Sequence, residues 1–158
     1  MKKICFVSVV HPKVESYLVD FFNSLKAQTY KSFELILFND GLDSSMLMGL
    51  CSNLSITIID VNGTPNEIRN DMISFLMRSE FNYCVFGDAD DFFEKNRVEE
   101  NLRLLKSNDI VVNDVHLISQ MGEIIKKNYF SKRMNNLSAI DFDDIMDKNI
   151  IGLGNSSI

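Results

Sequence analysis

The sequence of 158 residues has little positive charge, few cysteines, prolines and glycines, and no long hydrophobic run. Its formal net charge of −6 excludes a general nucleic-acid binder, because contacts to a phosphate backbone need clustered lysine and arginine. A single nucleotide is not excluded, since one arginine and one metal ion suffice to hold it. The apolar run that follows residues 1–3 is too short for a signal peptide or a membrane span. We therefore expect a cytoplasmic protein, with the inner face of the membrane as a second location.

The three cysteines are an odd number without metal-ligand spacing, and two of them, Cys5 and Cys84, lie inside apolar runs. They predict buried free thiols in a reducing compartment. Only two prolines and seven glycines, without a low-complexity segment, predict one domain over residues 1–158. The sequence has neither a Gly-x-Gly-x-x-Gly motif after its first apolar run nor a Gly-Lys-Ser/Thr motif. A dinucleotide-binding Rossmann domain and a P-loop NTPase are therefore both disfavoured.

Strand-like apolar runs alternate with amphipathic segments along most of the chain. Strands are expected at residues 4–10, 33–38, 55–61, 82–87 and 109–113, and helices at residues 14–28, 44–54, 66–79 and 97–107. This alternation predicts βαβ units that build an α/β fold, a doubly wound, mostly parallel sheet with helices on both faces. Residues 115–119 and 124–127 predict a β-hairpin near the C-terminus, and a last helix is expected over residues 138–147.

The most informative stretch is the apolar run at residues 83–87, which leads directly into Asp88, Asp90 and Asp91. Carboxylates this close repel one another, and a divalent cation with oxygen ligands relieves the repulsion. The Asp-x-Asp spacing therefore predicts a Mg²⁺ or Mn²⁺ site that leaves coordination positions for phosphates. The alternative is that the carboxylates cap a helix beginning near Glu94, a role that Asp91 can fill.

Three further residues are expected near the same edge of the sheet, where ligands bind in folds of this kind. Asp40 follows the second apolar run, so its carboxylate either accepts hydrogen bonds from a nucleobase or ribose, or closes an Asp-Gly turn. Arg69 either pairs with a diphosphate or the acidic cluster, or faces solvent. His11 either contacts a ligand or ends the first strand. A basic segment at residues 126–133 is interpreted as solvated surface, with binding of anionic lipid or of a ligand phosphate as the alternatives.

Taken together and in order, these motifs resemble the N-terminal part of the family 2 glycosyltransferases, which have the GT-A fold. The resemblance rests on Ser8-Val9-Val10, Gln28-Thr29-Tyr30, Phe33-Glu34-Leu35-Ile36, Asn39-Asp40-Gly41-Leu42-Asp43, Gly63 with Ile68-Arg69-Asn70, and Asp88-Ala89-Asp90-Asp91. Residues 152–157 are similar to a segment that these enzymes carry after the hairpin.

The resemblance implies an inverting, metal-dependent glycosyltransferase that moves a sugar from a nucleotide-diphosphate sugar, with UDP-sugar favoured. The acceptor would be a hydroxyl of a glycan or lipid-linked molecule in cell-surface polysaccharide synthesis. By position, the resemblance assigns nucleotide-sugar contacts to Val10, Pro12, Asp40, Arg69, Asp88 and Ala89, and the Mn²⁺ or Mg²⁺ ion to Asp90. Asp40 would read the nucleobase, Arg69 would lie near the base or diphosphate, and Asp88 would contact the ribose.

The chain departs from the family pattern at three places. Asn39 replaces the first aspartate of the Asp-Asp-Gly turn, a mild change because the second aspartate is the one that would read the nucleobase. Residues 11–13 replace the usual Pro-Thr-Tyr-Asn, and the family's Glu-Asp motif, which holds the catalytic base, has no counterpart. We therefore expect a donor-binding part that stops before the acceptor-binding part, and no catalytic residue is assigned. Two other functions stay open: a nucleotidyltransferase, disfavoured by the missing glycine-rich loop, and a non-catalytic module that binds a nucleotide sugar or a partner.

Overall fold

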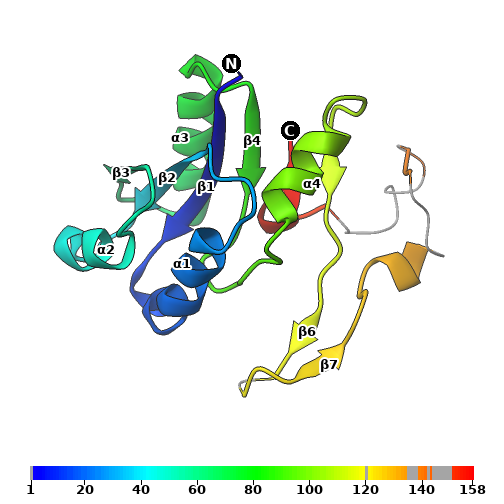
Figure 1. Ribbon diagram of the computed structural model, residues 1–158. Helices are drawn as coiled ribbons and strands as arrows, with labels where there is room; N and C mark the ends of the chain where they lie inside the picture. The colour runs from blue at the N-terminus through cyan, green and yellow to red at the C-terminus, as the bar shows by residue number, and fades with distance from the viewer. Residues whose placement is uncertain (1, 120, 135–138, 142, 144–150) are drawn as a thin grey trace.

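A computed structural model of the chain describes residues 2–119, 121–134, 139–141, 143 and 151–158, and its central feature is a six-stranded sheet of order β3-β2-β1-β4-β8-β5 (Figure 1). The strands are β1 (Ile4–Val10), β2 (Glu34–Asn39), β3 (Ile56–Asp60), β4 (Tyr83–Phe86), β5 (Val111–Val112) and β8 (Ser156–Ser157). Strands β1 to β4 pair in parallel, whereas β8 runs antiparallel to both of its neighbours. The predicted α/β fold with a mostly parallel sheet is confirmed.

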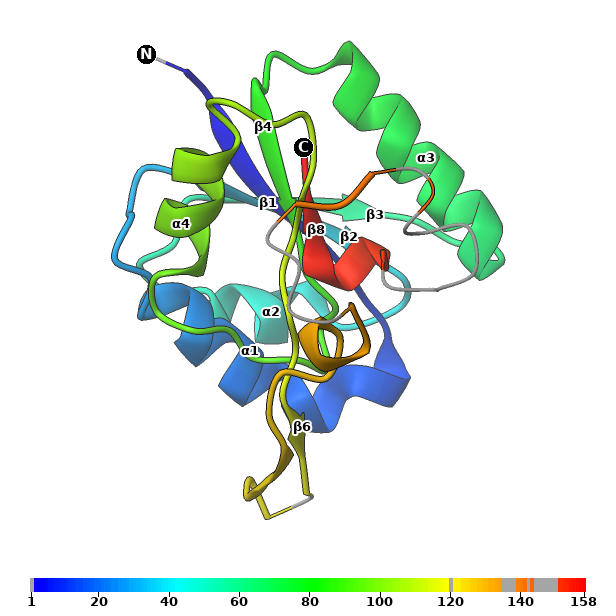
Figure 2. The same cartoon turned by 90° about the vertical axis from the view of Figure 1, so that its right-hand side faces the viewer.

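Helices cover both faces of this sheet, as predicted (Figure 2). They are α1 (Leu18–Lys26), α2 (Ser44–Leu50), α3 (Pro65–Arg78) and α4 (Arg97–Leu104), with 3-10 turns η1 (Pro12–Tyr17), η2 (Ser131–Met134) and η3 (Leu153–Asn155). Helices α1, α2 and α4 contribute to one buried cluster, and α3 contributes to a second cluster on the opposite face. Both faces of β1 are therefore buried, which is why its sequence is apolar at almost every position.

Phe6 of β1 lies at the centre of the larger core and is fully buried. Its ring centroid is 6.4 Å from those of Phe21 and Phe33 and 5.0 Å from that of Phe93. Phe93 belongs to the loop between β4 and α4, so this aromatic cluster joins the middle of the sheet to the segment that follows the acidic residues. Aromatic pairs of this kind stabilise a core beyond the area that they bury.

The helix ends differ from the predicted ones for local reasons. The expected helix over residues 14–28 is divided, because Pro12 starts the 3-10 turn η1 and α1 begins only at Leu18. Asp43 caps α2 by accepting a hydrogen bond from the Ser45 amide. The capping role considered for Asp91 is wrong: α4 begins at residue 97, with Asn96 as the N-cap residue and no side-chain cap.

The last residues of the chain form a strand inside the sheet, which the sequence did not predict. The Cys84 amide of β4 donates to the Ile158 carbonyl at 2.7 Å, and the Ile158 amide donates back at 3.0 Å. On the other side, the Asn113 amide donates to the Asn155 carbonyl at 2.7 Å. Strand β8 therefore separates β4 from β5, and Ser157 is fully buried between them.

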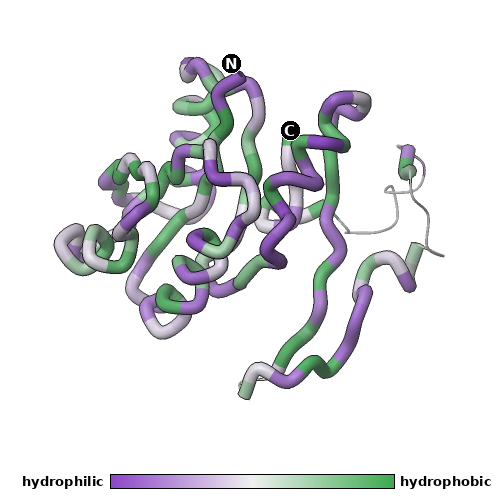
Figure 3. Tube along the Cα trace, in the orientation of Figure 1, coloured by the Kyte–Doolittle hydropathy of each residue, from purple (hydrophilic) through white to green (hydrophobic). Residues whose placement is uncertain are grey.

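The predicted hairpin is present as β6 (Leu117–Ile118) and β7 (Ile124–Lys126), which pair antiparallel and extend away from the sheet (Figure 1). Figure 3 shows that part of this hairpin is hydrophobic, and the side chains of Met121 and Ile125 are 88% and 70% exposed. The helix expected over residues 138–147 falls mostly outside the described residues. Within the described ranges, no helix has the length and apolar character needed to cross a membrane.

Candidate functional site

A cleft of about 420 Å³ opens where β1, β2 and β4 end, between the β4–α4 loop and the start of α3. Its position is the one expected for a ligand site in a parallel α/β sheet, and its volume lies in the range of small-molecule sites. Most of the predicted site residues gather along its walls, namely Asp40, Arg69, Asp88, Ala89 and Asp90. Residues separated by up to fifty positions in the sequence thus converge on one cavity because parallel strands end at the same edge.

Val10 and Pro12 lie beside the cleft rather than in its lining. The Val10 side chain is fully buried, and its carbonyl accepts a hydrogen bond from the Asp40 amide at 2.8 Å. Pro12 is exposed at the start of η1. The neighbouring residues His11 and Lys13 do line the cleft, and of these two only His11 was a candidate from the sequence.

Asn39 builds the turn that presents Asp40. Its side-chain amide donates to the Leu42 carbonyl and to the Asp60 carboxylate, both at 2.9 Å, while its oxygen accepts from the Leu42 amide at 2.9 Å. Gly41 follows with a backbone φ of +90°, a conformation that residues other than glycine rarely adopt. The side-chain amide of Asn39 both donates and accepts hydrogen bonds at this buried position. Asparagine can therefore stabilise the turn where the family pattern has aspartate.

Negative charge accumulates on the acidic turn, residues 87–91. Burial raises the pKa of Asp88, and the charge of Asp90 raises it further, against the opposing charges of Arg69 and Arg97. Burial, together with Asp90 and Asp88, also raises the pKa of Asp91 to about 6. Among the described residues, the ion pairs are Lys3 with Glu80 and Arg103 with Glu100, and neither lies at the turn.

The donor set of the turn fits a divalent cation held jointly with a ligand. No group of three or more histidine, cysteine or acidic side chains is placed to hold a metal ion in the part of the chain that the structure describes. Asp88 and Asp90 line the cleft and offer hard carboxylate oxygens. Mg²⁺ typically takes one or two carboxylates and completes its shell with phosphate oxygens and water. The two carboxylates would therefore supply only part of the shell of such an ion.

The family model of glycosyl transferase family 2 matches residues 5–152 of this chain. The chain belongs to this family. Two curated relatives are each 27% identical: an uncharacterized glycosyltransferase of Rickettsia conorii, over 78% of this chain, and the glycosyltransferase GlyA of Streptococcus pneumoniae, over 85%. The chain spans about a fifth of the length of each relative, 21% in both cases.

Solved structures agree with this family on the fold. The crystal structure of residues 1–349 of TarS from S. aureus is similar with a TM-score of 0.58 at 19% identity, over 75% of this chain and 39% of that one. TarS 1–349 in complex with UDP-GlcNAc is similar with a TM-score of 0.56 at 21% identity, over 70% and 33%. A 4-diphosphocytidyl-2C-methyl-D-erythritol synthase of Anaerococcus prevotii reaches a TM-score of 0.56 at 12% identity, over 79% and 63%. The fold alone therefore does not separate the two enzyme classes, whereas the family match does.

The sequence interpretation missed two residues of this family 2 site. Arg97, interpreted only as the start of a helix, is buried next to the acidic turn. Gly154 lies against Asp88, since a Cβ atom at Gly154 would be 2.0 Å from Asp88 Oδ2. The similarity of residues 152–157 to a family segment was the signal that could have found Gly154, but nothing in the sequence brings that segment next to Asp88.

Replacing Gly154 by alanine is expected to weaken nucleotide binding while leaving the fold stable. The new methyl group would displace the Asp88 carboxylate, which is the movable end of a side chain that still reaches solvent. We expect the affinity for a nucleoside diphosphate to fall about tenfold, the effect of losing one hydrogen bond to a charged group. Gly49→Ala is the control, because a Cβ atom there meets nothing within 4 Å. Equal affinities of the two variants, measured by calorimetric titration, would contradict a role for the position of Asp88.

Replacing Asp91 by asparagine is expected to stabilise the free protein at neutral pH. Because the pKa of Asp91 is raised to about 6 in the fold, the native state favours the protonated acid, and stability is lost as the pH rises through this value. The side chain reaches solvent, so screening limits the gain at about pH 7 to about 1 kcal/mol, and the gain should vanish by about pH 4. Urea unfolding of both proteins at the two pH values measures the difference. A gain that is the same at both would refute the explanation, and Asp71→Asn, an exposed change on α3, is the control.

Proposed function

We propose that this chain forms the donor-binding part of a glycosyltransferase that uses a nucleotide-diphosphate sugar, with UDP-sugar as the favoured donor. The observation that carries the proposal is the gathering of Asp40, Arg69, Asp88 and Asp90 on one cleft of suitable size in a family 2 chain. Such a donor requires a group that recognises the nucleobase, a positively charged side chain for the phosphates, and two carboxylates, one for the ribose and one for the metal ion. The UDP-GlcNAc complex of the similarly folded TarS supports the choice of donor class.

Each wall of the cleft is proposed to hold one part of the donor. Asp40, whose amide is fixed on the Val10 carbonyl, accepts hydrogen bonds from the nucleobase. Arg69, on the first turns of α3, pairs with the diphosphate, since a guanidinium matches phosphate geometry. Asp88 accepts from the ribose hydroxyls, and the buried Ala89 keeps the turn close to the cavity. Pro12 starts η1 and so directs His11 and Lys13 toward the nucleotide.

Asp90, assisted by Asp88, is the proposed holder of Mn²⁺ or Mg²⁺. Such an ion stabilises the negative charge that develops on a departing nucleoside diphosphate. The transfer itself is proposed to proceed with inversion to a hydroxyl of a glycan or lipid-linked acceptor, in cell-surface polysaccharide synthesis. No residue of this chain is assigned as the catalytic base. Donor binding is therefore the part of the proposed activity that can be tested directly on this chain.

Calorimetric titration of the chain with UDP, and with GDP for comparison, tests the proposal. Each nucleotide is titrated with and without Mn²⁺. We expect UDP to bind when Mn²⁺ is present and to bind at least about tenfold more weakly without it, because the phosphates and the two carboxylates repel one another. Binding of GDP with equal affinity would reject the assignment of a uridine donor. If neither nucleotide binds, the donor site itself is rejected.

Two other functions make different predictions in the same assay. A nucleotidyltransferase, favoured only by the fold similarity to the Anaerococcus synthase, should prefer a nucleoside triphosphate over UDP. A non-catalytic module should bind a UDP-sugar with metal but neither transfer nor hydrolyse it. Product analysis after incubation with a radiolabelled UDP-sugar and Mn²⁺ separates this module from an active enzyme.

A further inference from the structure

Arg97 is a buried cation that forms no direct ion pair among the described residues, although the nearby charges of Asp91 and Asp88 act on it. It is the first residue of α4 and is only 8% exposed. Neither of the two ion pairs found in the described ranges involves it. Burying a charge is costly unless hydrogen bonds or opposite charges compensate, so the groups that surround this guanidinium indicate what it does.

The contacts of Arg97 surround the acidic turn on both sides. Its Nη2 donates to the Phe86 carbonyl at 2.5 Å, directly before the turn, and its guanidinium carbon lies 4.5 Å from the ring centroid of Phe93, two residues after it. The same Nη2 donates to the Gly154 carbonyl at 3.0 Å. Gly154 is the residue that abuts the Asp88 carboxylate. One side chain thus contacts the start of the turn, its end and the segment that supports it.

We propose that Arg97 is a positioning residue of the donor site, which clamps the acidic turn against residues 152–155 so that Asp88 and Asp90 face the bound nucleotide diphosphate. This inference rests on the proposed function, because the ligand is the proposed donor. Arginine suits the task better than lysine, since its planar fork donates in several fixed directions and stacks on an aromatic ring. Nε of Arg97 uses another of these directions to reach Asn113 Oδ1 at 3.1 Å.

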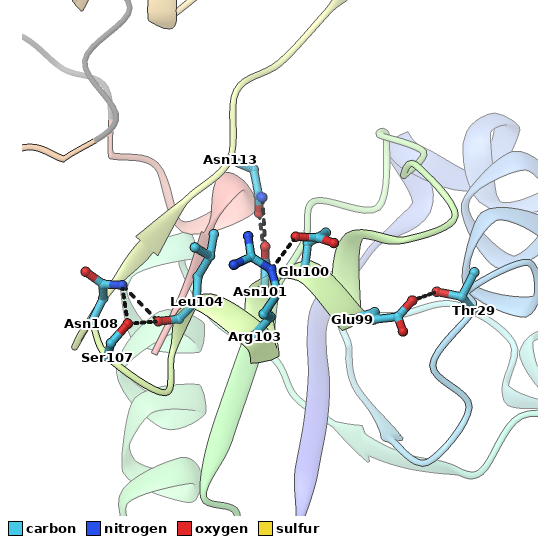
Figure 4. Close-up of polar contacts among 9 residues, drawn as sticks. All are labelled: Thr29, Glu99, Glu100, Asn101, Arg103, Leu104, Ser107, Asn108 and Asn113. Carbon is cyan, nitrogen blue, oxygen red and sulfur yellow. Dashed lines mark hydrogen bonds and ion pairs between the residues drawn. The ribbon is translucent and has the colours of Figure 1, made fainter.

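Asn101 offers a matched control from the same helix and the same buried network. It is fully buried, and its Nδ2 donates to Asn113 Oδ1 at 2.8 Å and to Ser157 Oγ at 2.7 Å. Figure 4 shows Asn101 and Asn113 facing each other, and the Asn113 amide returns a bond of 2.8 Å. Asn101 has no hydrogen bond to Phe86 or Gly154 among those described. Its loss should therefore loosen β8 without releasing the turn.

The test compares Arg97→Met, Arg97→Lys and Asn101→Ala with the unchanged chain. Thermal unfolding gives the stability of each, and titration with UDP and Mn²⁺ gives its affinity. We expect Arg97→Met to bind at least about tenfold more weakly, as for the loss of charged hydrogen bonds, with Arg97→Lys intermediate. Asn101→Ala should bind within about twofold of the unchanged chain, even where it lowers the melting temperature as much. Affinity that falls in step with stability in all variants would overturn the proposal.

A second measurement separates this proposal from the proposed function. Backbone amide signals of residues 87–91 and 152–155 in ¹H–¹⁵N NMR spectra report the turn without any ligand. Both sets of signals should shift in Arg97→Lys and Arg97→Met, whereas in Asn101→Ala the signals of residues 87–91 should stay in place. If these shifts occur but the unchanged chain does not bind UDP, the proposed donor site is rejected, whereas the positioning role of Arg97 for the acidic turn is supported. Unshifted signals in the Arg97 variants would reject the clamp, whatever the nucleotide affinity.

Discussion

Replacing Asp90 by asparagine is expected to abolish metal-dependent binding of UDP to this chain. The change keeps the size of the side chain but removes the charge that a hard cation requires. Asp90 lines the cleft, and no cluster of three candidate ligands exists among the described residues to take over. We expect the affinity in Mn²⁺ to fall at least about 100-fold, since losing even outer partners of metal ligands costs 10- to 100-fold. Calorimetric titration with UDP and Mn²⁺ measures the loss.

Asp43→Asn is the matched control for this experiment. It removes the same charge from a residue that caps α2 and does not line the cleft. Its affinity should stay within about twofold of the unchanged chain, as for a distant independent site. Unchanged affinity of Asp90→Asn in Mn²⁺ would reject Asp90 as the metal ligand. A loss of equal size with and without Mn²⁺ would instead make Asp90 a direct contact of the nucleotide.

Replacing Phe6 by alanine is expected to cost about 3–5 kcal/mol of unfolding free energy, the usual result for a large aromatic residue in a core. Phe6 is fully buried, and three aromatic rings pack around it. The substitution leaves a cavity inside the core, and the rings of Phe21, Phe33 and Phe93 lose their contacts with Phe6. Urea unfolding followed by circular dichroism measures the change, with Phe92→Ala as the control, since Phe92 is 53% exposed.

The same substitution should weaken nucleotide binding in whatever fraction of the protein still folds. A Cβ atom at Gly87 would lie 2.5 Å from Phe6 Cζ and 2.6 Å from Phe93 Cζ, so both rings press on the backbone at the base of the acidic turn. Removing the Phe6 ring withdraws that support from one side. A loss of stability below about 1 kcal/mol would contradict the central place of Phe6 in the core, because Phe→Ala in a core rarely costs so little.

The sequence predicted the first four strands and most of the candidate site because their signals are local. Strand β1 is a continuous apolar run, the pattern of a strand buried on both faces. Once parallel βαβ units are accepted, their geometry brings Asp40, Arg69 and Asp88 to one edge without further information. The helix boundaries were less exact, since the 3-10 turn at Pro12 depends on backbone geometry that hydrophobic periodicity does not report.

Strand β8 and Arg97 were not predictable for the opposite reason. The two serines of β8 have no strand-like pattern, and their partners in β4 lie about seventy positions away. The role of Arg97 depends on the Gly154 carbonyl, which is brought near only by that pairing. Polar residues in a buried network are specified by their partners in space, and a single sequence does not name those partners.

The place of β8 also fixes the order in which the molecule can be completed. Strands β1 to β4 have all their parallel partners by residue 86, whereas β5, made by residue 112, has no neighbour in the sheet until residues 156–157 are available. During synthesis, the four parallel strands are therefore available to pair well before residues 156–157 can join β5 to them. Because Arg97 can bond to Gly154 only once residue 154 has been made, the acidic turn gains this contact later than the strands that lead into it.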